Sequence, residues 1–126
     1  MCGICGWVTL TNHEIDPSVL TRMITVLGHR GPDATGEWWS ENCALGHTRL
    51  SILDIDGGSQ PMVGESGAAI VFNGEIYNYR DITAQLKSKG VVFRTRSDTE
   101  VVLNAYREWG DSCVNHLEGM FAFAIM

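Results

Sequence analysis

The stretch that decides the fold opens the chain: Met1-Cys2-Gly3-Ile4-Cys5-Gly6-Trp7-Val8. Its short run of apolar residues predicts a β-strand over residues 3–10, with no helix or loop before it. A cysteine therefore stands at the very start of the first strand.

Cys2 is a candidate nucleophile. The small second residue favours removal of Met1, which would leave Cys2 with a free α-amine. At neutral pH such an amine can act as a base toward the neighbouring thiol, so one residue would supply both nucleophile and base. The alternative is an ordinary small residue at the end of the chain.

The spacing of Cys2 and Cys5 also matches redox and zinc motifs. A structural zinc site needs a second pair nearby, but Cys43 and Cys113 stand far apart in the sequence. A redox dithiol normally lies at a helix N-terminus, whereas this pair lies in a strand. We therefore expect no metal site, and we expect Cys5, Cys43 and Cys113 to pack as small reduced side chains.

Length and composition predict one globular domain: 126 residues, 44% hydrophobic, with a net charge of −6. The acidic balance, without a run of Lys or Arg, argues against nucleic acid or an anionic membrane as a partner. No apolar stretch approaches the roughly 20 residues of a membrane helix, and no signal sequence opens the chain, so we expect a cytoplasmic protein.

Apolar periodicity and capping residues predict the elements along the chain. Asp16-Pro17 begins one helix, and Ser97 with Glu100 forms a capping-box pattern at the start of another. The predicted helices cover residues 17–27, 79–89, 98–109 and 111–117. The predicted strands after the first cover residues 37–40, 44–50, 68–72, 91–93 and 119–126. This order indicates an α+β domain built in layers.

Polar residues follow three of the predicted strands: Arg49, then Asn73-Gly74-Glu75, then Ser97-Asp98. The ends of strands in layered sheets are common ligand sites. A guanidinium suits a carboxylate, an amide with a glycine N–H suits an oxyanion, and two acids suit an ammonium group. The set predicts an amino-acid site, although each member alone could be a turn, a cap or an exposed strand residue.

The loop over residues 29–36 is polar. Arg30 and Asp33 form either a solvated ion pair or part of a loop that closes over a ligand, with Gly31 and Gly36 as hinges. We expect a structural role for His29.

Several motifs in combination closely resemble the glutaminase domain of glutamine-hydrolysing asparagine synthetases. They occur in that family's order and spacing, and they are Met1-Cys2-Gly3-Ile4-Cys5-Gly6, His29-Arg30-Gly31-Pro32-Asp33, Gly46-His47-Thr48-Arg49-Leu50-Ser51-Ile52, Gly58-Ser59-Gln60-Pro61-Met62, Phe72-Asn73-Gly74-Glu75-Ile76-Tyr77-Asn78, Ser97-Asp98-Thr99-Glu100 and Gly119-Met120-Phe121-Ala122-Phe123-Ala124. The family belongs to the class II glutamine amidotransferases, which are N-terminal nucleophile hydrolases with an αββα sandwich.

The resemblance implies a role for each candidate residue. Cys2 would attack the side-chain amide of L-glutamine, and Asn73 and Gly74 would form the oxyanion hole. Arg49 would bind the α-carboxylate, Glu75 and Asp98 the α-ammonium, and the backbone at Ile52 would line the pocket. The products would be glutamate and ammonia, formed by way of a γ-glutamyl thioester, and this step needs no cofactor.

The resemblance also implies more chain than residues 1–126. The family's glutaminase domain continues through further strands, and a C-terminal synthetase domain binds ATP and Mg²⁺ and uses the ammonia to amidate aspartate. We therefore expect a C-terminally truncated glutaminase domain with an incomplete sandwich, poorly active alone and possible as a homodimer. Two alternatives remain open: an amidotransferase with a different ammonia acceptor, and a non-catalytic paralogue that acts as an interaction module.

Overall fold

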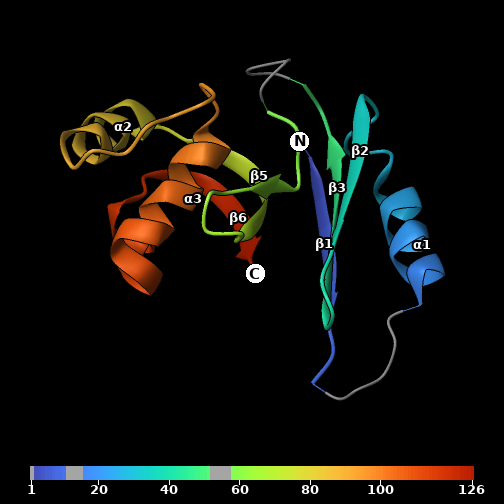
Figure 1. The fold of residues 1–126 in the computed structure, drawn as a ribbon. Helices are drawn as coiled ribbons and strands as arrows, with labels where there is room; N and C mark the ends of the chain where they lie inside the picture. Colours follow the sequence, from blue (N-terminus) through green and yellow to red (C-terminus); the bar gives the residue numbers. More distant parts are fainter. Residues whose placement is uncertain (1, 11–15, 52–57) are drawn as a thin grey trace.

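A computed structural model describes residues 2–10, 16–51 and 58–126. One antiparallel sheet contains β1 (Gly3–Val8), β3 (Cys43–Arg49) and β2 (Ala34–Trp39), in the order β1-β3-β2. The helix α1 (Pro17–Leu27) covers one face of this sheet (Figure 1).

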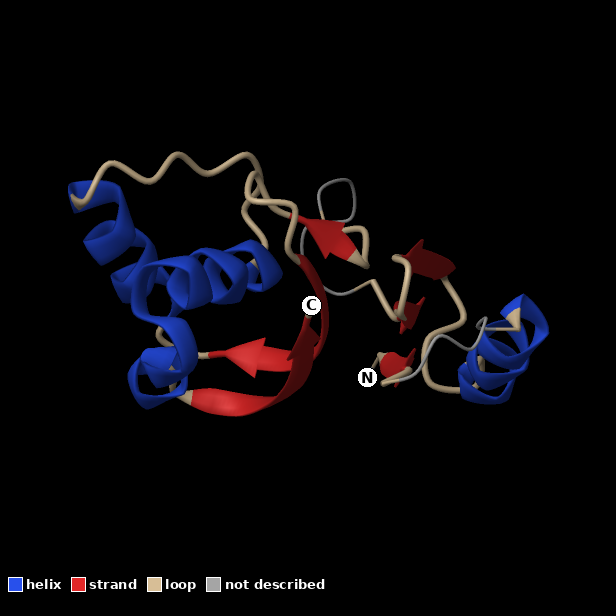
Figure 2. Cartoon of the chain, turned by 60° about the horizontal axis from the view of Figure 1, so that its bottom comes forward, coloured by secondary structure: helices blue, strands red, loops and turns tan. Residues whose placement is uncertain are grey.

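The second antiparallel sheet has the order β4-β5-β6. Its strands are β4 (Met62–Val63), β5 (Ala69–Ile76) and β6 (Gly119–Ile125). The helices α2 (Tyr79–Ser88) and α3 (Asp98–Trp109) cover the face of this sheet that points away from the first sheet (Figures 1 and 2). A 3₁₀ helix, η1 (Gly110–His116), connects α3 to β6.

The two sheets face one another and give an αββα order of layers. Successive side chains of β3 point to opposite faces of its sheet, so one face packs against α1 and the other against the second sheet. Ala44 packs against α1, whereas Leu45 packs between the sheets with Val71 of β5. The expectation of an α+β fold with an αββα arrangement is therefore confirmed.

The strand β5 is buried on both faces, as the apolar run in the sequence predicts. Ala69 and Val71 face the first sheet. Ile70 and Phe72 face the other way and join the core formed with α2 and α3. The strand runs on to Ile76, four residues beyond the predicted end, so the polar residues 73–75 lie within the strand rather than in a turn after it.

The helix starts match the sequence except in one detail. The Asp16 side chain accepts from the Ser18 N–H at the start of α1, and the Ser97 side chain accepts from the Thr99 N–H at the start of α3. The Glu100 carboxylate, however, does not complete a capping box. It accepts hydrogen bonds from the Arg94 and Thr95 N–H groups and so holds the loop before the helix.

The strand predicted over residues 91–93 is wrong, because these residues form no strand. The side chains of Val91 and Phe93 pack against the core that α2 and α3 help to form, whereas Val92 between them is 78% exposed. Conversely, the two-residue β4 was not predicted. Within the described ranges, no helix has the length and apolar character that a membrane crossing requires.

Candidate active site

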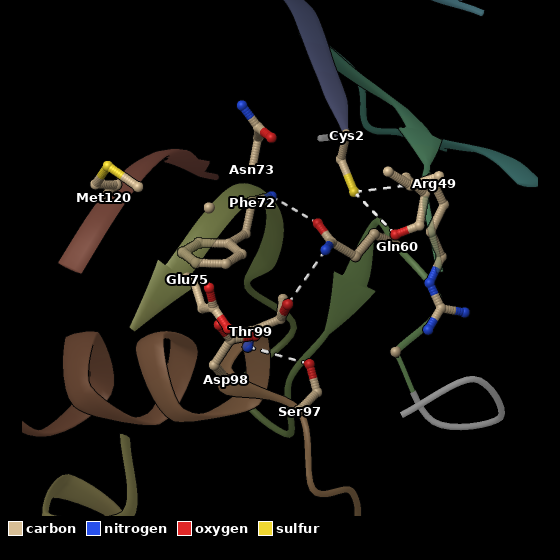
Figure 3. Close-up of a pocket in the computed structure, with 13 residues that line it drawn as sticks. Cys2, Arg49, Gln60, Phe72, Asn73, Glu75, Ser97, Asp98, Thr99 and Met120 are labelled. Carbon is tan, nitrogen blue, oxygen red and sulfur yellow. Dashed lines mark hydrogen bonds between the residues drawn. The ribbon is translucent and has the colours of Figure 1, made fainter. Parts of the chain in front are cut away.

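A cavity of about 240 Å³ opens where the end of β3, the second half of β5 and the N-terminus of α3 meet (Figure 3). It is smaller than the pockets that hold drug-sized ligands, so it suits a small molecule such as an amino acid. Its lining contains Cys2, Arg49, Leu50, Gly58, Gln60, Phe72, Asn73, Gly74, Glu75, Ser97, Asp98, Thr99 and Met120.

The Cys2 thiol points into this cavity (Figure 3). Its Sγ lies 3.4 Å from the Leu50 N, which donates to it, and 3.8 Å from the Leu50 O. The Arg30 Nε donates to the Cys2 carbonyl oxygen at 2.9 Å. These contacts hold both the backbone and the sulfur of Cys2 in place.

The structure separates Cys2 from the other three cysteines. An offset of three residues along an extended chain puts Cys5 on the opposite face, where it packs against α1. All four cysteines are free, and burial raises the pKa of the Cys5, Cys43 and Cys113 thiols. Within the described residues, no group of three or more His, Cys, Asp and Glu side chains could hold a metal.

The charged groups lie on two sides of the cavity. Arg49, at the end of β3, is only 8% exposed and lies on one side, and Glu75 and Asp98 lie on another (Figure 3). Burial raises the pKa of the Asp98 carboxyl, and the nearby Glu75 charge adds to this, while hydrogen bonds from the Ile76 and Thr99 N–H groups oppose it. A ligand cation beside the two carboxylates would therefore relieve an unfavourable arrangement of charge.

Asn73 and Gly74 lie in β5 beside the cavity. Asn73 is on the face of the strand that looks toward the first sheet, and its Oδ1 is buried without a hydrogen-bond partner in the described part of the chain. Gly74 has a φ of 155°, and a Cβ there would lie 2.2 Å from the Met120 carbonyl oxygen of β6. Only glycine allows this close approach of the two strands.

Beyond its pairing with β4, the edge of β5 that points away from β6 supplies hydrogen-bond donors to the cavity. Ala69 and Met126 exchange both backbone hydrogen bonds, so the alternating pattern turns the N–H groups of Phe72, Gly74 and Ile76 away from β6. Gln60 Oε1 accepts from the Phe72 N–H at 2.6 Å, and Asp98 Oδ2 accepts from the Ile76 N–H at 3.2 Å. Along β5, the Gly74 N–H lies between the Phe72 and Ile76 N–H groups, whose hydrogen bonds these two side chains accept.

His47 lies between the two sheets, next to Phe72 of β5, and only 1% of its surface is exposed. Its Nε2 is 3.3 Å from the Phe72 carbonyl oxygen. Burial lowers the pKa of this imidazole to about 4, and the Arg49 charge adds to that effect. The ring is therefore neutral at pH 7 and donates from Nε2 to the carbonyl.

Most of the residues predicted from the sequence come together in this cavity: Cys2, Arg49, Asn73, Gly74, Glu75 and Asp98. Ile52 lies outside the described residues. Sequence reasoning gave no role to Gln60 and Thr99, although both occur in the motifs that carry the family resemblance. The buried His47 was missed in the same way.

The loop before β2 does not contain the predicted ion pair between Arg30 and Asp33. Arg30 and Asp33 have different partners, because Arg30 binds the Cys2 carbonyl and the Asp33 carboxylate accepts from the Ser51 N–H at 2.7 Å. Gly31 packs against the backbone at Thr48, where a Cβ would lie 2.5 Å away, so close packing explains this glycine without a hinge.

Comparisons with known proteins show the family of this chain. A family model described as a glutamine amidotransferase domain matches residues 1–126. Asparagine synthetase [glutamine-hydrolyzing] 3 of Bacillus subtilis is 42% identical over 99% of this chain, and amidase chry2 of Gibberella zeae is 39% identical over 99%. In each case the chain spans 21% of the relative's length.

A solved structure shares the fold. Glutamine phosphoribosylpyrophosphate amidotransferase of B. subtilis superposes with a TM-score of 0.57 and 26% identity, over 69% of this chain and 21% of that one. With a family model matching all of residues 1–126, the chain belongs to the glutamine amidotransferase domain family and is homologous to the glutaminase half of glutamine-hydrolysing asparagine synthetases.

Proposed function

We propose that Cys2, with Met1 removed, hydrolyses L-glutamine to glutamate and ammonia. The observation that carries the proposal is that the Cys2 thiol opens into the same small cavity as Arg49, Glu75 and Asp98. One cationic and two anionic groups complement the α-carboxylate and α-ammonium of an amino acid. The cysteine then faces the amino acid's side chain.

The reaction follows from these groups. The α-amine of Cys2, through a water molecule, takes the thiol proton as Sγ attacks the amide carbon of glutamine. The Asn73 side-chain N–H and the Gly74 N–H stabilise the resulting oxyanion. The C–N bond breaks, the proton goes to the leaving nitrogen, and ammonia departs. Water then adds to the γ-glutamyl thioester, and glutamate leaves as the thiol is restored.

The test uses stable covalent modification of the Cys2 thiol, because we expect slow turnover by the isolated chain. The chain is incubated with an electrophilic glutamine analogue, and the modified residue is identified by intact mass and peptide mapping. Labelling should be confined to Cys2, should be blocked by L-glutamine, and should disappear in Cys2→Ala. Retention of Met1 in the purified chain, or equal labelling of all four thiols, would contradict the proposal and would favour a non-catalytic paralogue.

The matched control is Cys5→Ala. Cys5 lies three residues away on the opposite face of the strand, against α1, so its loss should leave labelling of Cys2 unchanged. A loss of labelling in this variant as large as in Cys2→Ala would mean that disruption of β1, rather than loss of the nucleophile, explains both results.

We further propose that the ammonia serves the ATP-dependent amidation of aspartate in a longer protein. The support is the homology to a protein named asparagine synthetase [glutamine-hydrolyzing] 3, of which this chain spans 21%. ATP and Mg²⁺ would bind outside residues 1–126. Because the chain is also similar to amidase chry2, the second candidate function is delivery of the ammonia to an acceptor other than aspartate. Expression of the complete reading frame decides between them: asparagine formed from aspartate, ATP and glutamine supports the first, and glutaminase activity without asparagine supports the second.

A further inference from the structure

Two side chains hold the backbone of Phe72, the residue directly before Asn73. Gln60 Oε1 accepts from its N–H at 2.6 Å, and His47 Nε2 lies 3.3 Å from its carbonyl oxygen. The Phe72 carbonyl belongs to the same peptide group as the Asn73 N–H. The position of Asn73 therefore depends on contacts from two other segments of the chain.

Gln60 also connects β5 to α3. Its Nε2 donates to the Thr99 Oγ1 at 3.2 Å (Figure 3). Thr99 is only 2% exposed and follows Asp98 in the first turn of the helix. One amide side chain thus joins the strand that carries Asn73 and Gly74 to the helix start that carries Asp98.

Gln60 occupies a place that a strand would otherwise fill. Met62 of β4 pairs with Ile70, so two more residues of the same register would put residue 60 opposite Phe72. The strand starts only at Met62, and the Gln60 side chain supplies the acceptor that a backbone carbonyl would have supplied. Without it, the buried Phe72 N–H would lose its partner, and the strand would shift to find another.

We propose that Gln60 is a positioning residue for the oxyanion hole. It holds Phe72 so that Asn73 and Gly74 stay beside the cavity that the Cys2 thiol lines, and through Thr99 it fixes their separation from Asp98. The inference rests on the proposed glutaminase function. Donors to a developing oxyanion act through geometry set in advance, and a small misplacement lowers the rate of the chemical step far more than it weakens binding.

The experiment measures labelling of Cys2 by the electrophilic glutamine analogue over a range of concentrations. This separates the maximal rate constant, kinact, from the half-saturating concentration, KI. Gln60→Met keeps the length of the side chain and removes both hydrogen bonds, so kinact should fall about 10- to 100-fold with a smaller change in KI. Gln60→Glu keeps an acceptor for the Phe72 N–H and should recover part of the loss.

Thr99→Val provides a second route if Gln60→Met does not fold. It removes the acceptor for the Gln60 Nε2 and should lower kinact to a smaller extent. The matched control is Thr48→Val, because the Thr48 hydroxyl also makes a partly buried hydrogen bond, to the Leu27 carbonyl at 3.2 Å, on the α1 side of the first sheet. Thr48→Val should lower the free energy of unfolding in urea by an amount similar to that of Thr99→Val, and it should leave kinact unchanged.

Three results would overturn the inference. In the first, kinact of Gln60→Met and Thr99→Val equals that of Thr48→Val while Cys2 is still labelled, so the proposed function stands and the positioning role fails. In the second, Gln60→Met changes KI and leaves kinact equal to that of the unmodified chain. In the third, Gln60→Glu is no faster than Gln60→Met. Absence of specific labelling in the unmodified chain overturns the proposed function and this inference together.

Discussion

Acidification should destabilise the chain through the imidazole of His47. Burial between the two sheets lowers its pKa from 6.5 to about 4. Below pH 6.5 the unfolded chain takes up a proton on this ring, whereas the folded chain does not until about pH 4. Since one pKa unit corresponds to about 1.36 kcal/mol, the free energy of unfolding should fall by roughly 3 kcal/mol across that window and by about 2 kcal/mol between pH 6.5 and 5.

The assay is urea unfolding followed by tryptophan fluorescence, because the chain has four tryptophans. It is run at several pH values between 7 and 5, for the unmodified chain and for His47→Gln. The variant can still donate to the Phe72 carbonyl but cannot titrate, so its stability should change much less with pH. Protonation of Asp98, whose pKa burial raises, favours the fold and is common to both chains. Equal slopes in the two chains would refute the reasoning.

Three further predictions concern the cavity. Asn73→Ala should lower kinact for Cys2 labelling about 10²- to 10³-fold with little change in KI, because it removes one oxyanion donor; a change in KI alone would contradict this. Asp98→Asn should raise KI about 10-fold or more, since a charged hydrogen bond to the ligand's ammonium group is lost. In the unmodified chain KI should also rise as the pH falls through the raised pKa of Asp98, whereas KI of the variant, which keeps only the Glu75 carboxylate, should change less over the same range. Gly74→Ala should lower the free energy of unfolding by more than about 2 kcal/mol, because its Cβ would lie 2.2 Å from the Met120 carbonyl oxygen; urea unfolding that matches the unmodified chain would contradict this close approach.

Local signals were sufficient for the elements whose stability is local. The Asp16-Pro17 start of α1 and the Ser97 start of α3 are set by hydrogen bonds within two residues, so the sequence shows them directly. Residues 91–93 show the limit of such signals. Their apolar pattern fits a strand, but a strand requires a neighbour for its backbone, and only tertiary structure decides whether one is present.

The same distinction separates the site residues that were predicted from those that were missed. Arg49, Asn73 and Asp98 have side chains whose chemistry suits a ligand, and the family motifs group them. Gln60 and His47 act on the backbone of Phe72, 12 and 25 positions away in the sequence. No periodicity or spacing encodes such contacts, and an amide or an imidazole in a motif does not reveal which peptide group it will bind.

The shortness of β4 explains why the cavity can exist. A longer β4 would have used its own carbonyl groups to pair with both Phe72 and Gly74, and β5 would have had no free donor beside Cys2. Because β4 begins only at Met62, side chains replace the missing strand at Phe72 and Ile76. The Gly74 N–H is then directed toward the cavity, and an oxygen of a bound ligand can take the place that a strand carbonyl holds in an uninterrupted sheet. The late start of β4 is therefore as much a part of this site as the cysteine.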